Sequence, residues 1–355
     1  MKPILVDAHL DLAYNAVVLG RDLLRSVNEI RHLEAATPPP GSPAGMCMTT
    51  VPALLEGRVA IVGGSLFVAP DFKGLREPQA YHTTQEAHRY AVLQLDYYRR
   101  LADENEQVVL LNTVVDMEAV LASWDTEQPQ LGIFVVMEGA EPIREPGEVG
   151  WWVERGLRGV GLTWSMGTRY AGGNAAPGPL TDDGRQLLVT MADYNLLLDL
   201  SHLWEEAAYE ALDRYPGPVV ATHANPRAFV DRLRMLPDTL IRRIADCDGV
   251  IGVIPFNRML DEDWRPGAAR LPLTRLVEVI DHICQITGDA RFVGIGSDFD
   301  GGFGQEAVPE GVESSADLGK LGALLVERGY ADADINAILS GNWLRILRRV
   351  LSGGF

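Results

Sequence analysis

The chain has 355 residues, with 31 Lys and Arg against 49 Asp and Glu, which gives a formal net charge of −18. At 47% hydrophobic and 23% charged residues, the composition is that of a soluble globular protein and excludes a disordered one. The acidic balance, with no cluster of Lys and Arg to offset it, argues against nucleic acid and against an anionic membrane surface as partners.

The cysteines and the first residues of the chain bear on its compartment. Cys47, Cys247 and Cys284 are widely spaced and include no CxxC pair, so we expect neither a disulfide framework nor a thiolate zinc site. The first residues lack the apolar stretch and cleavage site of a secretory signal, and no 18 apolar residues run together. We therefore expect a cytoplasmic protein.

Short apolar segments of strand length alternate with segments of helical periodicity. The predicted strands are 4–6, 61–68, 108–111, 133–137, 159–163, 196–200, 219–222, 250–254 and 292–295. The predicted helices are 84–101, 182–194, 205–212, 237–245, 274–286, 315–327 and 332–351. Apolar strands that alternate with helices indicate a parallel sheet buried on both faces, and close to eight such units favour an α/β fold of the TIM (β/α)8 barrel type. Because nine segments compete for eight barrel positions, we predict that 108–111 is the extra strand.

Two loops rich in Pro and Gly, at 37–45 and 172–179, are expected on the rim of this barrel. Only residues 1–36 precede the first loop, too few for a separate domain. We therefore predict a single catalytic domain over residues 1–355, with rim insertions near 24–60 and 165–180.

Side chains of the kind that bind divalent metals follow five of the predicted strands. They are His9 and Asp11 together, Glu138, His202, His223 and Asp298. The carboxyl ends of all strands in a parallel barrel lie at one face, so these side chains are expected to converge there. Residues i and i+2 of a strand point to the same side, so His9 and Asp11 can bind one ion together.

Imidazole and carboxylate ligands in this mixture suit Zn²⁺, with Mn²⁺ or Co²⁺ as alternatives. His9, Asp11 and the two later histidines are too many ligands for one catalytic zinc, which must keep an open position, so two ions bridged by Glu138 fit better. A hydroxide between the ions would be the nucleophile, since metal binding lowers the pKa of water to around 7. Asp298 would accept a proton from this water and pass it to a leaving amine.

Each of these residues taken singly is more often structural, because a His or Asp at a strand end commonly caps a helix or stabilises a turn. Their joint occurrence on separate strands is what distinguishes them. We assign Asp7, Asp199 and His282 to structural roles, with Asp7 or Asp199 as a group that could orient a ligand. The sequence holds no GxSxG elbow, P-loop or dinucleotide fingerprint.

At these same residues the sequence resembles the membrane (renal-type) dipeptidase family, peptidase family M19, whose members are zinc peptidases of the amidohydrolase-like superfamily. The similarity runs from 6–11 to 341–345, and its most specific blocks are 137–141, 198–202, 218–225 and 294–301. The resemblance implies two zinc ions, one on His9, Asp11 and Glu138 and the other on Glu138, His202 and His223, with Asp298 as the catalytic acid/base.

The resemblance further implies that Arg234, eleven residues after His223, binds the free carboxylate of the substrate, a role that suits a planar bidentate donor. It also implies a homodimer. Trp164 stands where renal-type members have a histidine that contacts the scissile group, and an indole keeps an N–H donor but cannot titrate near neutral pH. We expect Trp164 and the following loop at 166–173 to affect substrate preference.

We therefore predict a zinc-dependent dipeptidase. One alternative is a related metal-dependent amidohydrolase acting on a small non-peptide amide or lactone. Members of that superfamily often use a carbamylated lysine as the bridge between the metal ions. In this sequence none of Lys2, Lys73 and Lys320 stands at a predicted strand end. Another is a catalytically silent relative that binds a ligand or partner. The intact set of five metal ligands and Asp298 argues against a silent relative.

Overall fold

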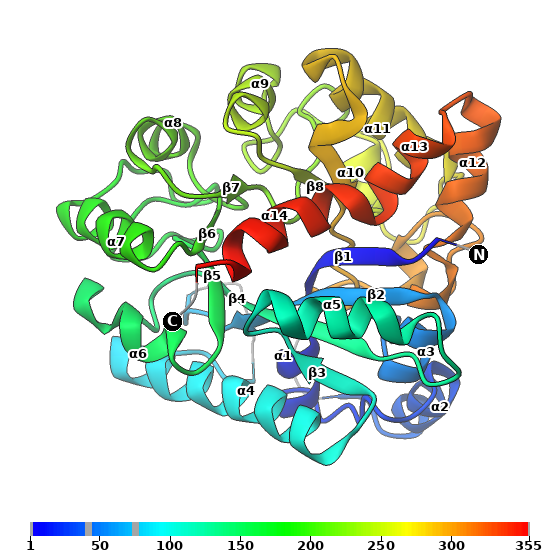
Figure 1. Cartoon of the computed structure of the whole chain (residues 1–355), viewed down its shortest axis with the longest axis horizontal. Helices are drawn as coiled ribbons and strands as arrows, with labels where there is room; N and C mark the ends of the chain where they lie inside the picture. Colours follow the sequence, from blue (N-terminus) through cyan, green and yellow to red (C-terminus); the bar gives the residue numbers. More distant parts are fainter. Residues whose placement is uncertain (1–2, 40–44, 73–77, 354–355) are drawn as a thin grey trace.

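The computed structural model describes residues 3–39, 45–72 and 78–353 (Figure 1). The strands are β1 (Leu5–Leu10), β2 (Val59–Phe67), β3 (Val108–Leu110), β4 (Leu131–Glu138), β5 (Leu157–Gly161), β6 (Leu197–Asp199), β7 (Val219–Val220), β8 (Ile251–Val253) and β9 (Val293–Ile295). Eight of them are parallel neighbours in the order β7-β6-β5-β4-β2-β1-β9-β8. Ala221, directly after β7, bridges to Ile251 of β8, which joins the two ends of the sheet. The fold is thus the predicted TIM-type barrel.

The ninth strand, β3, lies outside the ring. Val108–Leu110 pairs with the first three residues of β4, Leu131–Ile133. Two of these three, Gly132 and Ile133, also pair with β2 on their other side. Further along, β4 exchanges β3 for β5 as its second neighbour. The prediction that 108–111 is the extra strand is confirmed.

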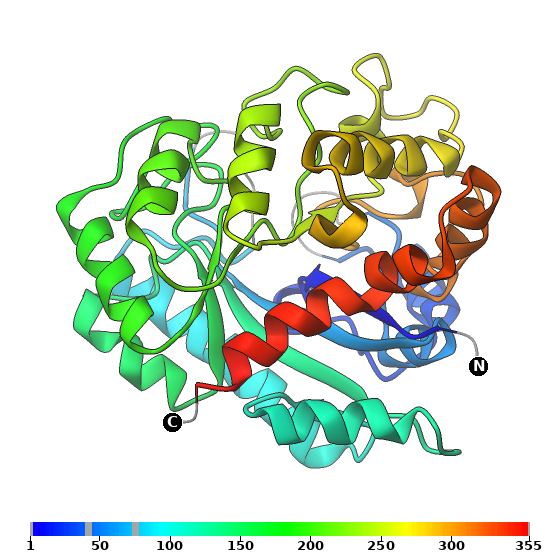
Figure 2. The same cartoon turned by 45° about the horizontal axis from the view of Figure 1, so that its top comes forward.

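Helices surround the barrel (Figures 1 and 2). They are α1 (Leu12–Val17), α2 (Val27–Ala36), α3 (Val51–Glu56), α4 (Thr84–Glu104), α5 (Val114–Ser123), α6 (Val149–Val153), α7 (Asp182–Asp193), α8 (Glu205–Arg214), α9 (Asp238–Asp246), α10 (Asn257–Leu260), α11 (Thr274–Thr287), α12 (Lys320–Arg328), α13 (Asp332–Asn336) and α14 (Asn342–Leu351). Five of them (α2, α3, α4, α5 and α7) begin at a side-chain cap, as in α4, where the Thr83 hydroxyl accepts from the backbone N–H of Glu86.

Two predicted helices near the end of the chain depart from regular α-helix in the structure. The segment 315–327 splits into a 3-10 turn, Ser315–Asp317, and α12, because Ser314 and Asp317 form a capping box around the short turn. The prediction of one continuous helix over 315–327 was therefore wrong. The segment 332–351 is helical throughout, as predicted, and contains the π-helical turn Ala337–Gly341 between α13 and α14.

The barrel interior is filled by apolar side chains from the strands and closed at one end by α14. Trp343 of α14 is fully buried and donates from its indole N–H to the carbonyl of Ile295 in β9. It packs so closely on Gly294 that a Cβ there would lie 2.3 Å from the indole nitrogen. With α14 covering this end, the opposite, carboxyl end of the strands is left for the polar residues described below.

The predicted rim segments have defined structure where they are described. α2 and α3 lie in the segment 24–60, and residues 40–44 of the predicted loop lie outside the described residues. The segment 165–180 is a loop anchored by the bridges Ala171 to Leu180 and Gly173 to Leu203.

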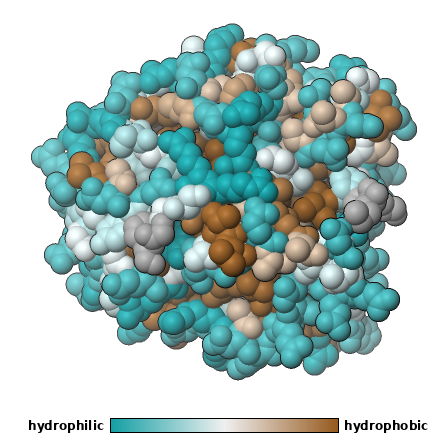
Figure 3. All heavy atoms as spheres, in the orientation of Figure 1, coloured by the Kyte–Doolittle hydropathy of each residue, from teal (hydrophilic) through white to brown (hydrophobic). Residues whose placement is uncertain are grey.

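Hydrophilic residues cover most of the face drawn in Figure 3, with an apolar area near its centre. This is expected, because the chain has 49 acidic and 31 basic residues and few of them are buried in the core. Among the described residues, no helix has the length and apolar character needed to cross a bilayer.

Candidate metal centre

Histidines and carboxylates from separate strands meet at the carboxyl end of the barrel. His9 lies in β1 and Asp11 directly after it, while Glu138 is the last residue of β4. His202 follows β6 and His223 follows β7. His9 and His223 are fully buried, and Asp11 and Glu138 are almost so. The barrel geometry therefore brings together the five residues that the sequence analysis selected as metal ligands.

The carboxylate of Glu138 lies between two sets of donors. Its Oε2 is 3.5 Å from Nε2 of His9, which is in turn 3.8 Å from Oδ1 of Asp11. Its Oε1 is 3.1 Å from Nε2 of His202 and 3.3 Å from Nε2 of His223. Two tetrahedral zinc ligands lie about 3.3 Å apart when each bond is about 2.0–2.1 Å, so the separations have the right scale. The two triads that could each hold an ion share only Glu138.

The donor set fits divalent cations in a second respect. Nε2 of His9 is buried and, among the described residues, has no hydrogen-bond partner. Nε2 of His202 lies 3.1 Å from Nε2 of His223, so two imidazole nitrogens face each other inside the site. A buried polar atom without a partner is costly, and a cation between such lone pairs removes the cost.

The buried charges strongly perturb one another. Burial would lower the pKa of His9, but the carboxylates of Glu138 and Asp11 raise it to about 10. Burial and the neighbouring Glu138 raise the pKa of Asp11 to about 7. Burial and the guanidinium of Arg234 lower the pKa of His202 to about 4. The carboxylates that stabilise a proton on His9 would equally stabilise a metal cation in its place, while the neutral His202 keeps a lone pair to offer.

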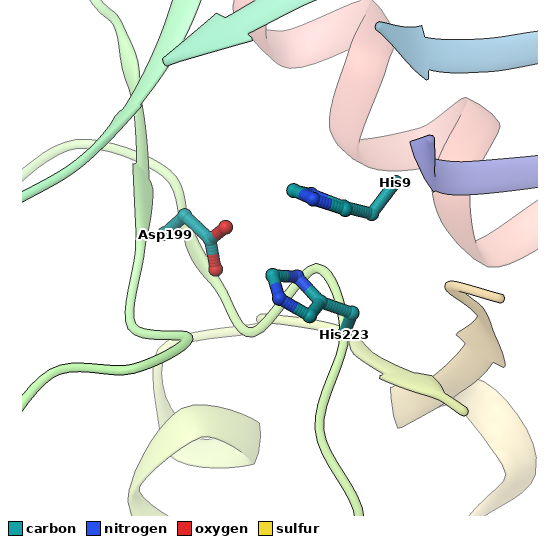
Figure 4. A group of neighbouring side chains, drawn as sticks. All are labelled: His9, Asp199 and His223. Carbon is teal, nitrogen blue, oxygen red and sulfur yellow. The ribbon is translucent and has the colours of Figure 1, made fainter. Parts of the chain in front are cut away.

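Asp199 lies close to the site but is already engaged. Figure 4 shows the rings of His9 and His223, whose centroids are 3.8 Å apart and whose planes are tilted by 31°, with the carboxyl group of Asp199 beside them. These three residues form another possible metal-binding group. However, Asp199 accepts from the backbone N–H groups of Ser201 and Thr222, both at 2.9 Å, and from the Thr222 hydroxyl. Its oxygens are therefore better placed to orient neighbours than to bind an ion.

Several residues that the sequence analysis did not select hold the ligands in place. The Thr222 hydroxyl is 2.9 Å from Nδ1 of His223, and Asn174 Oδ1 is 3.1 Å from Nδ1 of His202. Ser65 donates to the Asp11 carboxylate. Only Thr222 stands next to a ligand in the sequence; Asn174 and Ser65 are brought in by other strands and loops, and no local pattern marks them. These contacts fix the atoms that face the candidate metal centre.

Asp298 follows β9 and is held beside the ligands. Its backbone N–H donates to the carbonyl of His9 at 3.2 Å, and its φ is 56°. Burial, opposed by His9 and reinforced by Asp11 and Glu138, raises the pKa of Asp298 well above its usual range. Asp7 in β1 fixes the preceding residue, because it accepts from the backbone N–H of Ser297 at 2.8 Å and from the Ser297 hydroxyl.

Three arginines follow His223, and their partners distinguish them. Arg227 pairs with Glu205 at 2.9 Å, and Arg232 with Glu262 at 3.4 Å. Arg234 instead donates to the carbonyl of His223 at 2.7 Å. Its pKa is lowered by burial, while the nearby Asp298 and Glu138 oppose that shift. Arg234 is therefore the arginine of this segment that reaches the metal centre.

Trp164, three residues after the end of β5, is half-buried beside the candidate ligand His202. Its ring is 6.0 Å from that of His202 and 5.2 Å from that of Phe67, which in turn is 5.3 Å from Tyr14. Phe67 pairs in register with Glu138, so this aromatic group adjoins the shared carboxylate. These aromatic rings form an apolar wall of the site, next to the charged side chains of the candidate metal centre.

Comparison with known proteins decides the family. A model of the family described as membrane dipeptidase, peptidase family M19, matches residues 1–352. The chain belongs to this family. Membership in this family agrees with the His, Asp and Glu side chains that meet at the carboxyl end of the barrel.

Relatives of this membrane dipeptidase family member and solved structures give the range of similarity. An uncharacterized protein in the pqqA 5′ region of Klebsiella pneumoniae is 33% identical over 204 residues, which are 55% of this chain and 73% of that protein. An uncharacterized dipeptidase of Schizosaccharomyces pombe is 30% identical over 167 residues, 47% of this chain and 39% of that protein. A metallo peptidase from Rhodobacter sphaeroides, solved with a phosphinate mimic of the dipeptide L-Ala-D-Ala, has a TM-score of 0.80 at 22% identity and covers 99% of this chain and 100% of that one. That last likeness concerns the fold.

Proposed function

We propose that this chain is a zinc-dependent dipeptidase that hydrolyses the amide bond of dipeptides. The observation that carries the proposal is the placement of the Glu138 carboxylate, whose two oxygens face separate sets of ligands. Membership of the membrane dipeptidase family supports the same substrate class. The relatives align with this chain over part of their length, so the activity of the whole protein is part of the proposal.

His9, Asp11 and Glu138 would hold one zinc ion, and Glu138, His202 and His223 the other. Bound zinc at this position supplies a Lewis acid that polarises the scissile carbonyl and lowers the pKa of water to around 7. Glu138 would keep the two ligand sets in fixed relation, because one rigid carboxylate belongs to both.

Asp298 would carry the proton of the reaction. In amide hydrolysis water adds to the carbonyl carbon, the C–N bond breaks, and one proton must pass from the water to the departing nitrogen. A carboxyl group beside the ligands can accept that proton and then donate it to the amine. The peptide N–H that Asp298 donates to the His9 carbonyl ties the acid/base to a ligand-bearing strand.

Arg234 and the aromatic wall would position the substrate. Arg234 has one nitrogen on the His223 carbonyl, while its Nε is buried without a partner among the described residues, which leaves donors for an anion. A dipeptide carries its free carboxylate one residue from the scissile bond, within reach of an arginine at the metal centre. Trp164 and Phe67 would contact a side chain of the substrate. Cytoplasmic location and homodimer formation stay predictions.

The test is a dipeptide library, with L-L and L-D pairs, assayed with zinc-loaded protein alongside a metal analysis. We expect hydrolysis of free-acid dipeptides and about two zinc ions per chain. Fewer than about one zinc per chain after purification with zinc would refute the binuclear site. Turnover of small non-peptide amides or lactones but no dipeptide would favour a related amidohydrolase, and two bound zinc ions without any turnover would favour a silent binding relative.

A further inference from the structure

The turn that carries Asp298 has an unusual backbone. Asp298 and Asp300 have φ values of 56° and 65°, in the left-handed region that residues with a Cβ seldom adopt. The backbone N–H of Gly301 closes the turn on the carbonyl of Asp298 at 2.9 Å. Such a conformation persists only where the surroundings hold it.

A segment distant in sequence holds this turn through the side chain of Asp300. The buried Asp300 carboxylate accepts from the backbone N–H groups of Met48 and Thr49, both at 2.9 Å. It also pairs with Nη1 of Arg21 at 3.1 Å, and Arg21 is itself 4% exposed. An ion pair removed from water is held firmly when its remaining hydrogen-bonding positions are filled.

The positions around Arg21 are filled. Its Nε donates to Glu34 of α2 at 2.6 Å and its Nη2 to the carbonyl of Gly45 at 2.8 Å. Its Nη1 also donates to Asn15 Oδ1 at 2.8 Å. The Asn15 amide donates in turn to the carbonyls of Asp11 and Asp300, at 2.9 and 3.2 Å. One network thus links the rim segment, a proposed metal ligand and the Asp298 turn.

Within the turn, the side chain of Asp298 lies against Gly301. A Cβ added at Gly301 would lie 2.1 Å from Oδ1 of Asp298, so no other residue fits there unless this carboxylate moves. The location of the carboxylate therefore depends on the shape of the turn, and the shape of the turn depends on Asp300.

We propose that Arg21 and Asp300 are positioning residues for Asp298, so that Arg21 and the rim segment that follows it, both before β2, complete the catalytic site from outside the barrel. This inference rests on the proposed role of Asp298 as the acid/base. Neither residue touches the reacting atoms; each acts through the place it gives the Asp298 carboxylate.

The first experiment compares Arg21→Met, Arg21→Lys and Asp300→Asn with wild type on L-Ala-L-Ala and L-Ala-D-Ala, using whichever is turned over. A misplacement of about 1 Å can cost about 10²-fold in rate, so we expect Arg21→Met and Asp300→Asn to lower kcat by roughly 10- to 100-fold. KM and zinc content per chain should stay within about twofold of wild type, and Arg21→Lys should recover part of kcat because it keeps the charge. Arg25→Met is the matched control, since Arg25 lies in the same segment in an exposed pair with Asp22 at 3.0 Å.

The second experiment is a double-mutant cycle with Asp298→Asn. If Arg21 acts through Asp298, adding Arg21→Met to Asp298→Asn changes kcat by less than about twofold. If the double variant instead loses kcat by the product of the two single losses, the proposal is overturned. It is also overturned if Arg21→Met keeps wild-type kcat while Asp298→Asn loses it. Wild-type kcat in Asp298→Asn would instead remove the acid/base role itself, and the positioning proposal with it.

If Arg21→Met does not fold, Gly301→Ala takes its place in the double-mutant cycle. The added methyl group displaces the Asp298 carboxylate directly and leaves the ion pair in place. We expect the same loss of kcat, the same zinc content and no further loss in the Asp298→Asn background. Unchanged kcat in a folded Gly301→Ala variant contradicts the proposal.

Discussion

The hydroxyl group of Thr222 lies 2.9 Å from Nδ1 of His223. The same hydroxyl has the Asp199 carboxylate as a partner, and because a carboxylate only accepts, the hydroxyl donates to Asp199 and accepts from the imidazole. Nδ1 of His223 then carries the proton, and Nε2 presents its lone pair to the metal centre. The contact therefore selects the tautomer of a proposed ligand.

Thr222→Val removes this hydroxyl at nearly constant volume. We expect zinc affinity to fall by about 10- to 100-fold, the usual cost of losing a partner that orients a ligand. Competition with a zinc chelator measures it. Thr190→Val, which removes only a hydroxyl bonded to a carbonyl of its own helix, is the control. Equal zinc affinity in the two variants would show that Thr222 does not orient His223.

Glu138→Gln replaces one of the two oxygens with an amide nitrogen, which cannot bind a cation. Because both ligand sets depend on this residue, we expect bound zinc to fall from about two ions to about one or fewer per chain. Metal analysis of the purified variant checks the result. Glu141→Gln is a matched change three residues away, where the carboxylate accepts from Thr84, and should keep both ions.

Asp298→Asn keeps the shape of the side chain but removes the carboxyl group proposed to exchange a proton. We expect kcat to fall by about 10²- to 10⁴-fold while zinc content per chain is unchanged. Steady-state kinetics of dipeptide hydrolysis together with metal analysis test this. Loss of zinc in parallel with kcat would mean that Asp298 is a ligand and not the acid/base.

Arg234→Met should impair free-acid dipeptides far more than C-terminally amidated ones. A hydrogen bond to a charged group is worth about 1.5–3 kcal/mol, so kcat/KM for the free acid should fall by roughly 10- to 100-fold relative to the amide. Arg232→Met, which removes a cation with an ion-pair partner outside the centre, is the control. An equal loss on both substrate forms would argue against recognition of the carboxylate.

The barrel was predictable because its strands are apolar throughout. Residues 61–68 and 133–137 lie within or beside β2 and β4, whose side chains are all buried on both faces. Short helices such as α1 and α10, with six and four residues, carry too little periodicity to be recognised before tertiary packing stabilises them.

The convergence of the candidate ligands was predictable for a similar reason. Each stands at a strand end, and barrel topology brings strand ends together. The orienting residues differ in this respect. Ser65 and Asp11 are 54 positions apart, and Asn15 and Asp300 are 285 apart. The first pair depends on the register between β1 and β2, and the second on how α1 lies against the turn after β9. No local pattern in the sequence records either.

The pairing of β4 determines how readily this part of the protein unfolds. Its residues are bonded to β2 over almost the whole strand, to β3 at the beginning and to β5 at the end. Segments with so many partners separate only when the whole domain unfolds, whereas surface loops fluctuate at far lower cost. In hydrogen exchange, the amides of β4 should be among the slowest in the protein. Glu138, at the end of that strand, would then keep its position when the surface loops around it fluctuate.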